Sequence, residues 1–390
     1  MSFDEAYFGQ GIDRRNTDCE KWDDRGVMDA DGIPLWVADM DFPCAPAIEA
    51  AIRERAAHPC FGYNIQNPAD EEALIGFWQR RHGLTIHPGE TQMLPCVITG
   101  LKAAVRAFTR EGDSVAIVTP VYGPFYSSIE SNNRIVKAVS LLRNEDTGRY
   151  DIDFAAMEEA LKAGARLMML CSPHNPVSRL WSEEELRALC LLAEKYDVPI
   201  VCDEIHADFV YKPGRFVSIL SIPEGRKRAV MLCSASKTFN VAGLQQAAMV
   251  CVNPDMLKKL KQDMTAAGVT SGNTFALLAA RAAYTDCDEW LDGLVAYLDG
   301  SRKLLSELVK QSLPKAKMSP VEATYLAWLD LRAYGHTCEE MARRFRRAGV
   351  ALTGGTFFGS EGEGFMRVNF ACPRSQLIEG IKRVSAALEE

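Results

Sequence analysis

Short, mostly apolar runs alternate with amphipathic stretches through the middle of the chain. Five such runs read as strands, at residues 114–118, 167–175, 198–203, 229–233 and 247–252. Between two of them, residues 182–197 are predicted to form a helix that starts with a capping box of Ser182 and Glu185. Apolar strands separated by helices indicate a mostly parallel sheet that is covered on both faces. The sequence therefore predicts the α/β fold class.

Polar side chains stand at the ends of these runs. Thr119, Asn175 and Asp203 each close a run, and Lys237 follows residues 229–233 after a serine-rich turn. Ligands of parallel α/β sheets bind beyond the carboxyl ends of the strands. We therefore expect these side chains to meet at one edge of the sheet.

Lys237 lies in the segment SASKTFN, residues 234–240. A single lysine is usually a solvated surface charge, Asp203 alone reads as a solvated acid, and Asn175-Pro176 alone reads as a turn. Taken together, the three residues match the needs of pyridoxal 5'-phosphate. This cofactor requires an amine for its aldehyde, a carboxylate for its protonated ring nitrogen, and amide and hydroxyl groups for its ring oxygen and phosphate. Pyridoxal 5'-phosphate is therefore the predicted cofactor.

Charge and cysteine usage exclude several other classes of protein. A net charge of −8 and a pI near 5.5 argue against a nucleic-acid-binding surface. The sequence holds no apolar stretch of about 18 residues, so no membrane span is expected. Asp4 and Glu5 stand where a secretion signal would need positive charge. The twelve cysteines are scattered, many lie in strand-like runs, and none has zinc-binding spacing, which predicts a metal-free, cytoplasmic protein.

The sequence pattern changes after about residue 286. A long helix is expected over residues 290–308, followed by strands at 324–330 and 365–370 and a helix at 339–348. This pattern predicts three parts: an N-terminal segment (1–45) that joins the small domain and covers the active site, a large cofactor-binding domain (46–285), and a smaller α+β domain (286–390).

Seven segments carry a resemblance to a known family. They are KWD (21–23), PLWVADMDF (34–42), FGY (61–63), TPVY (119–122), DEIH (203–206), SASKTFN (234–240) and MRVNFACPRS (366–375). The chain resembles the fold-type I pyridoxal-phosphate enzymes, the superfamily of the class I/II aminotransferases. Within it, the chain is most similar to the cystathionine β-lyase branch, the cysteine C–S lyases of the MalY, PatB and cystalysin type.

The resemblance implies a role for each cofactor-binding residue. Lys237 would bind the cofactor covalently and later move the α-proton of the substrate, Asp203 would pair with the ring nitrogen, and Asn175 would bind the ring oxygen. His206 stands where aminotransferases carry a tyrosine facing the same oxygen. His206 has two possible roles, either contact with the cofactor ring or that of a hydrogen-bonded core histidine.

The phosphate group would be bound at a helix start near residue 100. The candidates are the backbone amides of Val97 and Ile98, with the hydroxyls of Ser234 and Ser236 opposite. Gln245 stands where aminotransferases usually place an arginine, so its role is open. Tyr122 would stack on the cofactor ring, or else be a core tyrosine. Tyr63 would reach the phosphate of the neighbouring subunit in a homodimer, or else be an ordinary surface or core tyrosine.

The resemblance also implies a substrate site. Arg367 would bind the substrate α-carboxylate with a two-pronged hydrogen bond, with Asn175 beside it, and Trp36 would cover the site. The catalytic residues would be Lys237, Tyr63 and Tyr122.

The implied reaction is α,β-elimination on L-cysteine S-conjugates such as L-cystathionine, which yields a thiol, pyruvate and ammonia. Two alternatives remain, namely an aminotransferase of the same fold and a protein with a regulatory binding role. The expected partners are a small amino-acid substrate and a second copy of the chain, and a regulator partner remains open.

Overall fold

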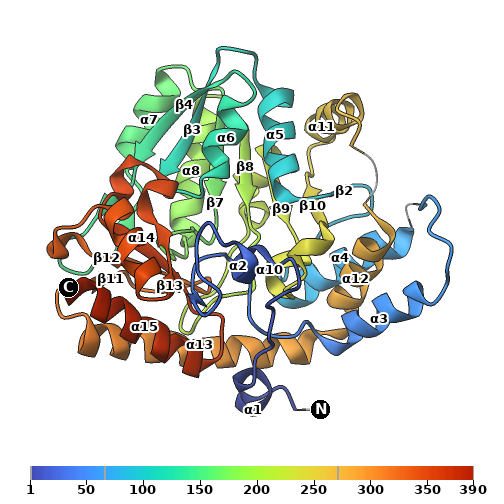
Figure 1. Cartoon of the computed structure of the whole chain (residues 1–390). Helices are drawn as coiled ribbons and strands as arrows, with labels where there is room; N and C mark the ends of the chain where they lie inside the picture. Colours follow the sequence, from blue (N-terminus) through green and yellow to red (C-terminus); the bar gives the residue numbers. More distant parts are fainter. Residues whose placement is uncertain (1, 66, 270–271, 390) are drawn as a thin grey trace.

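In the computed structural model, residues 2–65, 67–269 and 272–389 are described. Figure 1 shows a large central sheet flanked by helices, a smaller sheet beside it, and the long helix α13 (Asp288–Ser312) running beneath both. The predicted α/β fold with a large, mostly parallel sheet is confirmed.

The large sheet has seven strands. Their order is β2 (Thr91–Leu94), β10 (Ala247–Val250), β9 (Ala229–Cys233), β8 (Ile200–Asp203), β7 (Leu167–Cys171), β3 (Ser114–Thr119) and β4 (Ile135–Ser140). β10 is antiparallel to both of its neighbours, whereas the pairings from β9 through β4 are parallel. The carboxyl ends of β3, β7, β8 and β9 therefore lie at the same edge of the sheet.

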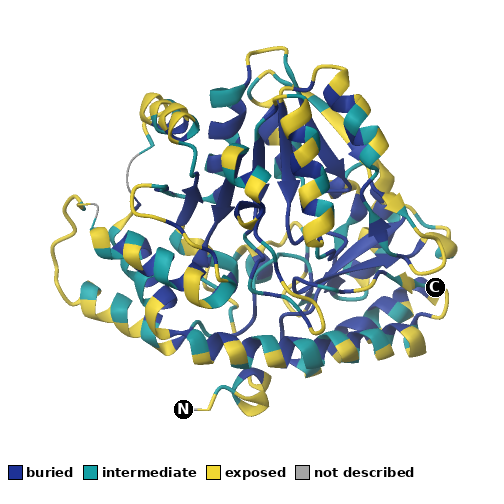
Figure 2. Ribbon diagram, turned by 180° about the vertical axis from the view of Figure 1, so that it is seen from behind, coloured by how far each residue is buried: buried dark blue, intermediate teal, exposed yellow. Residues whose placement is uncertain are grey.

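Both faces of this sheet are buried, as the dark central strands in Figure 2 show. Val230 and Leu232 pack into one hydrophobic cluster together with Leu101 of helix α5 (Val97–Phe108). The alternate residue Met231 packs into the other cluster, with Leu186 of helix α8 (Glu183–Lys195). Successive side chains of a strand point to opposite faces, so an all-apolar strand requires a cover on each side.

Local sequence signals explain where the covering helices start. α8 begins with the predicted capping box, in which Ser182 and Glu185 satisfy each other's backbone amides. Helix α5 begins at Val97, three residues before the expected start. The remaining helices of this part are α3 (Pro46–Ala56), α4 (Pro68–His82), α6 (Pro124–Glu130), α7 (Phe154–Lys162), α9 (Pro223–Arg228), α10 (Ala235–Thr238), α11 (Pro254–Ala266) and α12 (Thr274–Asp286).

The smaller sheet is antiparallel and comes from the last part of the chain. Its order is β11 (Lys317–Met318), β12 (Leu326–Asp330), β15 (Phe365–Asn369) and β14 (Thr353–Gly354). It packs with α13, α14 (Cys338–Arg347) and α15 (Arg374–Glu389). The two predicted strands and two predicted helices of this region are all present, with ends shifted by a few residues.

The N-terminal segment, which includes α1 (Glu5–Gly9) and α2 (Glu20–Asp23), contacts both parts of the molecule. β1 (Ile33–Pro34) pairs in parallel with β13 (Val350–Ala351) of the C-terminal part. A few residues later, the Asn240 side chain accepts a hydrogen bond from the amide of Met40 (2.9 Å) and donates one to its carbonyl oxygen (2.8 Å). The domain boundaries at residues 45 and 285 stay a prediction.

The described residues contain neither a membrane-crossing helix nor a cluster of metal-binding side chains. No helix there has the length and apolar character that crossing a bilayer would need. No group of three or more His, Cys, Asp or Glu side chains there could hold a metal ion.

Candidate active site

A cavity of about 780 Å³ lies at the carboxyl edge of the large sheet, beneath the N-terminal segment. It is lined by every predicted site residue except Tyr63. These are Trp36, Val97, Ile98, Tyr122, Asn175, Asp203, His206, Ser234, Ser236, Lys237 and Arg367. Residues separated by more than 300 positions in the sequence thus meet in one cavity, as the strand-end argument predicted.

Lys237 lies on the short helix α10, which follows directly after strand β9. Its amine donates a 2.7 Å hydrogen bond to the backbone carbonyl oxygen of Ala38 in the N-terminal segment. Burial lowers the pKa of Lys237, and the negative charge of Asp39 acts in the opposite direction. A buried amine with a lowered pKa is more readily present in the neutral form that attacks an aldehyde or takes a proton.

Asp203 is the last residue of β8 and is almost fully buried. Its carboxylate accepts a 3.1 Å hydrogen bond from the backbone amide of Ile205. Burial raises the pKa of Asp203 to about 7, although the positive charge of Lys237 works against this shift. A protonated ring nitrogen next to this carboxylate would supply the nearby positive charge that favours its ionised form.

Asn175 and Arg367 are joined by a hydrogen bond. The Arg367 Nη1 donates to the Asn175 Oδ1 at 3.1 Å, and Nη2 donates to the carbonyl oxygen of Trp36 at 2.8 Å. Asn175 lies four residues beyond the end of β7, so the expectation that it closes the strand is wrong by that distance.

Arg367 is buried without a carboxylate partner among the described residues. Only 3% of it is exposed, and its Nε has no hydrogen-bond partner. Burial lowers the pKa of Arg367 to about 10. A buried guanidinium of this kind fits a carboxylate that arrives from outside the protein.

The start of helix α5 faces the same cavity. Cys96 occupies the N-cap position but its side chain makes no capping hydrogen bond. The amides of Val97 and Ile98 therefore remain available for an anion at the positive end of the helix dipole. Ser236 also lines the cavity.

The hydroxyl of Ser234 is occupied within the protein. It donates to the carbonyl oxygen of Gln246 and accepts a 2.9 Å hydrogen bond from the amide of Ser236. Ser234 therefore caps α10 in this structure, and its only hydroxyl hydrogen is not directed toward the cavity. The prediction that this hydroxyl donates to a phosphate does not fit this arrangement.

Three further residues with open roles line the cavity. Burial lowers the pKa of His206 to about 3, so the ring is neutral, and it packs edge-on against Tyr325 with centroids 5.7 Å apart. Burial raises the pKa of Tyr122 above its usual value. Gln245 reaches the cavity from a left-handed backbone conformation at φ 57°.

Tyr63 does not reach the cavity of its own chain. Within a single chain the Tyr63 side chain is fully exposed. The nearby Phe61 and Ile65 are 59% and 79% exposed. Figure 1 shows this stretch as a blue loop that extends away from the body of the molecule beyond α3. Its predicted role in the neighbouring subunit stays a prediction.

Sequence reasoning missed several residues that hold the site together. Tyr325 donates a 2.9 Å hydrogen bond to the Ala38 carbonyl oxygen, and Thr353 accepts one from Arg367 at 3.3 Å. The buried pair of Lys21 and Asp41, 3.0 Å apart, anchors the N-terminal segment. The motifs KWD and PLWVADMDF contained this pair, but no local pattern indicated that the two side chains meet.

The donor set fits pyridoxal phosphate. Lys237 supplies the amine, Asp203 a buried carboxylate, Asn175 a free amide nitrogen, and α5 an uncapped amino end. These four groups come from separate strand ends of one sheet edge and line one cavity.

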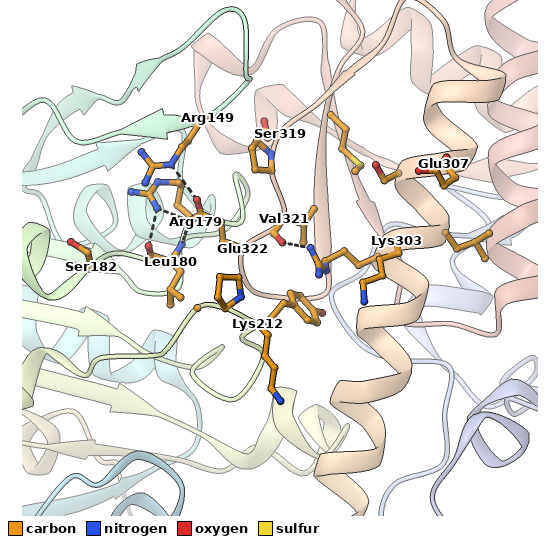
Figure 3. Close-up of a pocket in the computed structure, with 18 of the residues that line it drawn as sticks. Arg149, Arg179, Leu180, Ser182, Lys212, Lys303, Glu307, Ser319, Val321 and Glu322 are labelled. Atoms are coloured by element: carbon orange, nitrogen blue, oxygen red, sulfur yellow. Dashed lines mark hydrogen bonds and ion pairs between the residues drawn. The ribbon is translucent and has the colours of Figure 1, made fainter.

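A second, larger cavity of about 960 Å³ lies elsewhere, near the boundary between the two sheets, and contains none of the predicted site residues. Figure 3 shows Arg149 and Arg179 directed toward Glu322, with which both form ion pairs. Arg149 also pairs with Asp151 and Arg179 with Glu185, so each of these two guanidinium groups has carboxylate partners, whereas Arg367 has none among the described residues.

Comparisons with known proteins agree with the geometry. Residues 30–384 match the family model described as aminotransferase class I and II. The cystathionine beta-lyase PatB of Bacillus subtilis is 39% identical over 98% of this chain and 99% of its own length. Cystalysin from Treponema denticola, solved with a pyridoxal 5'-phosphate cofactor, superposes with a TM-score of 0.93 at 29% identity, covering 98% of both chains. The PLP-bound C-S lyase from Staphylococcus hominis gives a TM-score of 0.90 at 32% identity, also covering 98% of both chains.

Proposed function

The chain belongs to the class I and II aminotransferase family, and on that basis we propose that it is a pyridoxal-phosphate-dependent lyase that acts on L-cysteine S-conjugates. The reaction is α,β-elimination. A conjugate such as L-cystathionine and one water molecule give a thiol (homocysteine in this case), pyruvate and ammonia.

One observation carries this proposal. A half-buried amine with a lowered pKa (Lys237), a buried carboxylate (Asp203) and a buried guanidinium without a carboxylate partner (Arg367) line the same cavity. Three ionisable groups would be costly to bury together without a ligand that engages each of them. An amino-acid substrate on a pyridoxal cofactor engages all three.

Bound pyridoxal phosphate supplies an aldehyde that reacts with amines and a ring that accepts electrons from the α-carbon. The carboxylate of Asp203 would accept a hydrogen bond from the protonated ring nitrogen, and the Asn175 Nδ2 would donate one to the ring oxygen. The amides of Val97 and Ile98 and the hydroxyl of Ser236 would bind the phosphate, and Tyr122 would stack on the ring.

The same residues position the substrate. Arg367 binds the α-carboxylate through its two terminal nitrogens, and Asn175 and the Trp36 carbonyl oxygen fix the plane of the guanidinium. Lys237 then takes the α-proton at its Nζ, and the bond between the β-carbon and sulfur breaks as the thiolate leaves. The lowered pKa of Lys237 favours this step because a neutral amine is the form that accepts a proton.

Lyase and aminotransferase share all of these contacts, and the relatives favour the lyase. Among the similar proteins, PatB is named a cystathionine beta-lyase and two solved neighbours are cystalysin and a C-S lyase. The test is pyruvate release from L-cystathionine by the purified holoenzyme without any 2-oxo acid. Turnover that occurs only after a 2-oxo acid is added would refute the lyase and support the aminotransferase.

The proposal includes a homodimer whose sites are completed across the interface. Phe61, Tyr63 and Ile65 form an exposed apolar stretch beside α3, and an apolar surface of this kind favours burial against a second copy. Tyr63 would reach the phosphate in the partner's cavity. The oligomeric state in solution and its change on replacing Phe61 by Ser would test the interface.

A cytoplasmic location completes the proposal. All twelve cysteines are free, and eight of them are buried, which is the usage expected in a reducing compartment. The proposed function involves no nucleic-acid, membrane or regulator partner.

A further inference from the structure

The outer wall of the active-site cavity is formed by residues of the N-terminal segment. Arg14, Thr17, Asp18, Cys19 and Glu20 form this wall, and all five line the same cavity as the cofactor-binding residues. A substrate whose α-carboxylate is held by Arg367 leaves the group beyond its sulfur atom to occupy the rest of the cavity. The charges on this outer wall therefore act on the leaving group.

The cation of the outer wall is already neutralised. Arg14 forms two hydrogen bonds with the carboxylate of Asp39, at 2.7 and 2.8 Å, and a third with Asp41 at 3.1 Å. Lys21 lies behind it, buried, 3.0 Å from Asp41 and 3.6 Å from Asp39. Two cations and two carboxylates thus balance, and Arg14 has no free charge for a ligand.

The two remaining acidic residues of the outer wall have no cationic partner among the described residues. Asp18 and Glu20 are exposed, and neither forms an ion pair with any described residue. Burial is the main influence on the pKa values of Lys237 and Tyr122, and the negative charge of Glu20 adds a smaller upward contribution to both. Glu20 therefore lies close enough for its charge to reach into the cavity that it lines, whereas burial governs the pKa values of Lys237 and Tyr122.

We propose that Glu20, assisted by Asp18, selects cysteine conjugates whose leaving group is cationic or neutral at its far end and disfavours those whose leaving group is anionic. This inference rests on the proposed lyase function and adds the charge class of its substrate. Cystathionine satisfies it, since the far end of its leaving group carries an ammonium and a carboxylate and has no net charge.

The test compares conjugates of similar size and different charge. S-(2-aminoethyl)-L-cysteine is cationic at the far end, S-carboxymethyl-L-cysteine is anionic, and S-ethyl-L-cysteine is neutral. Pyruvate release by the holoenzyme gives kcat and KM for each. The selectivity ratio is kcat/KM for the aminoethyl conjugate divided by kcat/KM for the carboxymethyl conjugate. The two thiols differ in leaving ability, but this difference is the same in every variant. A change of the ratio between variants therefore reports on the protein alone.

Three variants and one control are needed. Glu20→Gln should lower the selectivity ratio roughly threefold, as expected for an exposed charge, and Glu20→Lys, which changes the charge by two units, roughly tenfold. Asp18→Asn should have a smaller effect, and asparagine tolerates the positive φ of 57° at this position. Glu339→Gln changes an exposed acid of α14 that does not line the cavity, so it should leave the ratio unchanged.

The change should appear in KM and not in kcat, with S-ethyl-L-cysteine unaffected. It should also shrink at about 1 M salt, where charges are screened within about 3 Å. An unchanged ratio in Glu20→Lys would overturn the inference while leaving the lyase function intact. If none of the three conjugates or cystathionine released pyruvate, the lyase function itself would be refuted, and the inference with it.

Discussion

The amine of Lys237 donates to the carbonyl oxygen of Ala38, 199 residues earlier in the chain. The same carbonyl oxygen accepts a hydrogen bond from the hydroxyl of Tyr325. The N-terminal segment thus contacts the amine of Lys237 directly, and several consequences for activity and stability can be measured.

Replacing Lys237 by Ala should remove both the covalent attachment of the cofactor and the acceptor of the α-proton. The rate of pyruvate formation should fall by at least about 10²- to 10⁴-fold, the usual contribution of a positioned acid–base group. Asp203, Asn175 and the phosphate contacts remain, so the variant should still bind the cofactor, more weakly. Near-normal pyruvate production by this variant would show that the site has been misread.

Replacing Arg367 by Lys keeps the charge but loses the two-pronged geometry. The loss of a buried, hydrogen-bonded contact to a carboxylate costs about 2–5 kcal/mol, so kcat/KM for cystathionine should fall by a factor of roughly 30 or more. Arg187→Lys changes a surface pair on α8 and serves as the control. A variant of Arg367 whose kcat/KM matches the wild type would exclude Arg367 from carboxylate binding.

Asp203 should make the stability of the cofactor-free protein depend on pH. Because burial raises its pKa to about 7, the folded state keeps a proton that the unfolded state has already released. The contribution of this group to stability is therefore full below its unfolded pKa of about 4 and is lost as the pH rises through about 7. Asp203→Asn should abolish this loss, on the order of 1–4 kcal/mol in all.

Thermal unfolding of both cofactor-free proteins at about pH 5 and about pH 8 measures the effect. The Asp203→Asn variant lacks the titrating carboxyl, so it should gain stability over the wild type at the higher pH. With the cofactor bound the order should reverse, because the wild-type carboxylate then has a cationic partner. The same pH dependence in both cofactor-free proteins would exclude Asp203 as its source.

Lys21→Met should destabilise the fold. It leaves the buried carboxylate of Asp41 without its nearest cation, although Arg14 and the Trp22 indole still contact that carboxylate. Breaking a buried pair in this way costs about 3–5 kcal/mol of unfolding free energy. Because Arg14 and Trp22 still contact the carboxylate, we expect a loss near the lower value. Urea unfolding measures it, and Lys310→Met, at an exposed pair on α13, should cost far less. Equal losses in the two variants would contradict the structural role of Lys21.

If Tyr63 completes the neighbouring site, two inactive variants should complement each other. Tyr63→Ala and Lys237→Ala homodimers each lack a residue in both sites, whereas a mixed dimer has one site with both residues. Random re-association should therefore restore activity in about a quarter of all sites. Mixing after mild denaturation and renaturation, followed by the pyruvate assay, tests this. No recovery from a mixture shown to contain mixed dimers would place Tyr63 outside the partner's site.

Local sequence signals predicted which segments form helices and strands better than they predicted where a helix begins or in which direction a strand runs. The capping box of α8 is local, and its predicted range differs from the observed one by only a few residues. Helix α5 begins at Val97 and not near Gly100, so this glycine lies inside the helix. A glycine suits that position because a Cβ there would lie 2.6 Å from Leu232. β10 was recognised as a strand, yet alternation of side chains carries no information about strand direction.

For the candidate site too, local motifs identified the residues, whereas the contacts between distant segments were not predicted. Lys237, Asp203 and Arg367 were identified because each stands in a distinctive motif, and Asn175 because it closes a strand-like run. The sheet topology brings all four to one cavity. The contacts of Ala38, Tyr325 and Lys21 join segments tens to hundreds of residues apart, which no short pattern records. Ser234 was placed correctly in the cavity wall, but the partner of its hydroxyl depended on the loop containing Gln246.

The stretch from Trp36 to Ala38 contacts both the guanidinium of Arg367 and the amine of Lys237. The carbonyl oxygen of Trp36 holds the guanidinium that binds the carboxylate, and the carbonyl oxygen of Ala38, two residues on, holds the amine that moves the proton. Since β1 and Asn369 fasten this stretch to the C-terminal part and Asn240 fastens it to the large sheet, any rotation of one part against the other must pull on it. Such a rotation would change carboxylate binding and the proton-transfer distance together, so the two functions are mechanically coupled to each other.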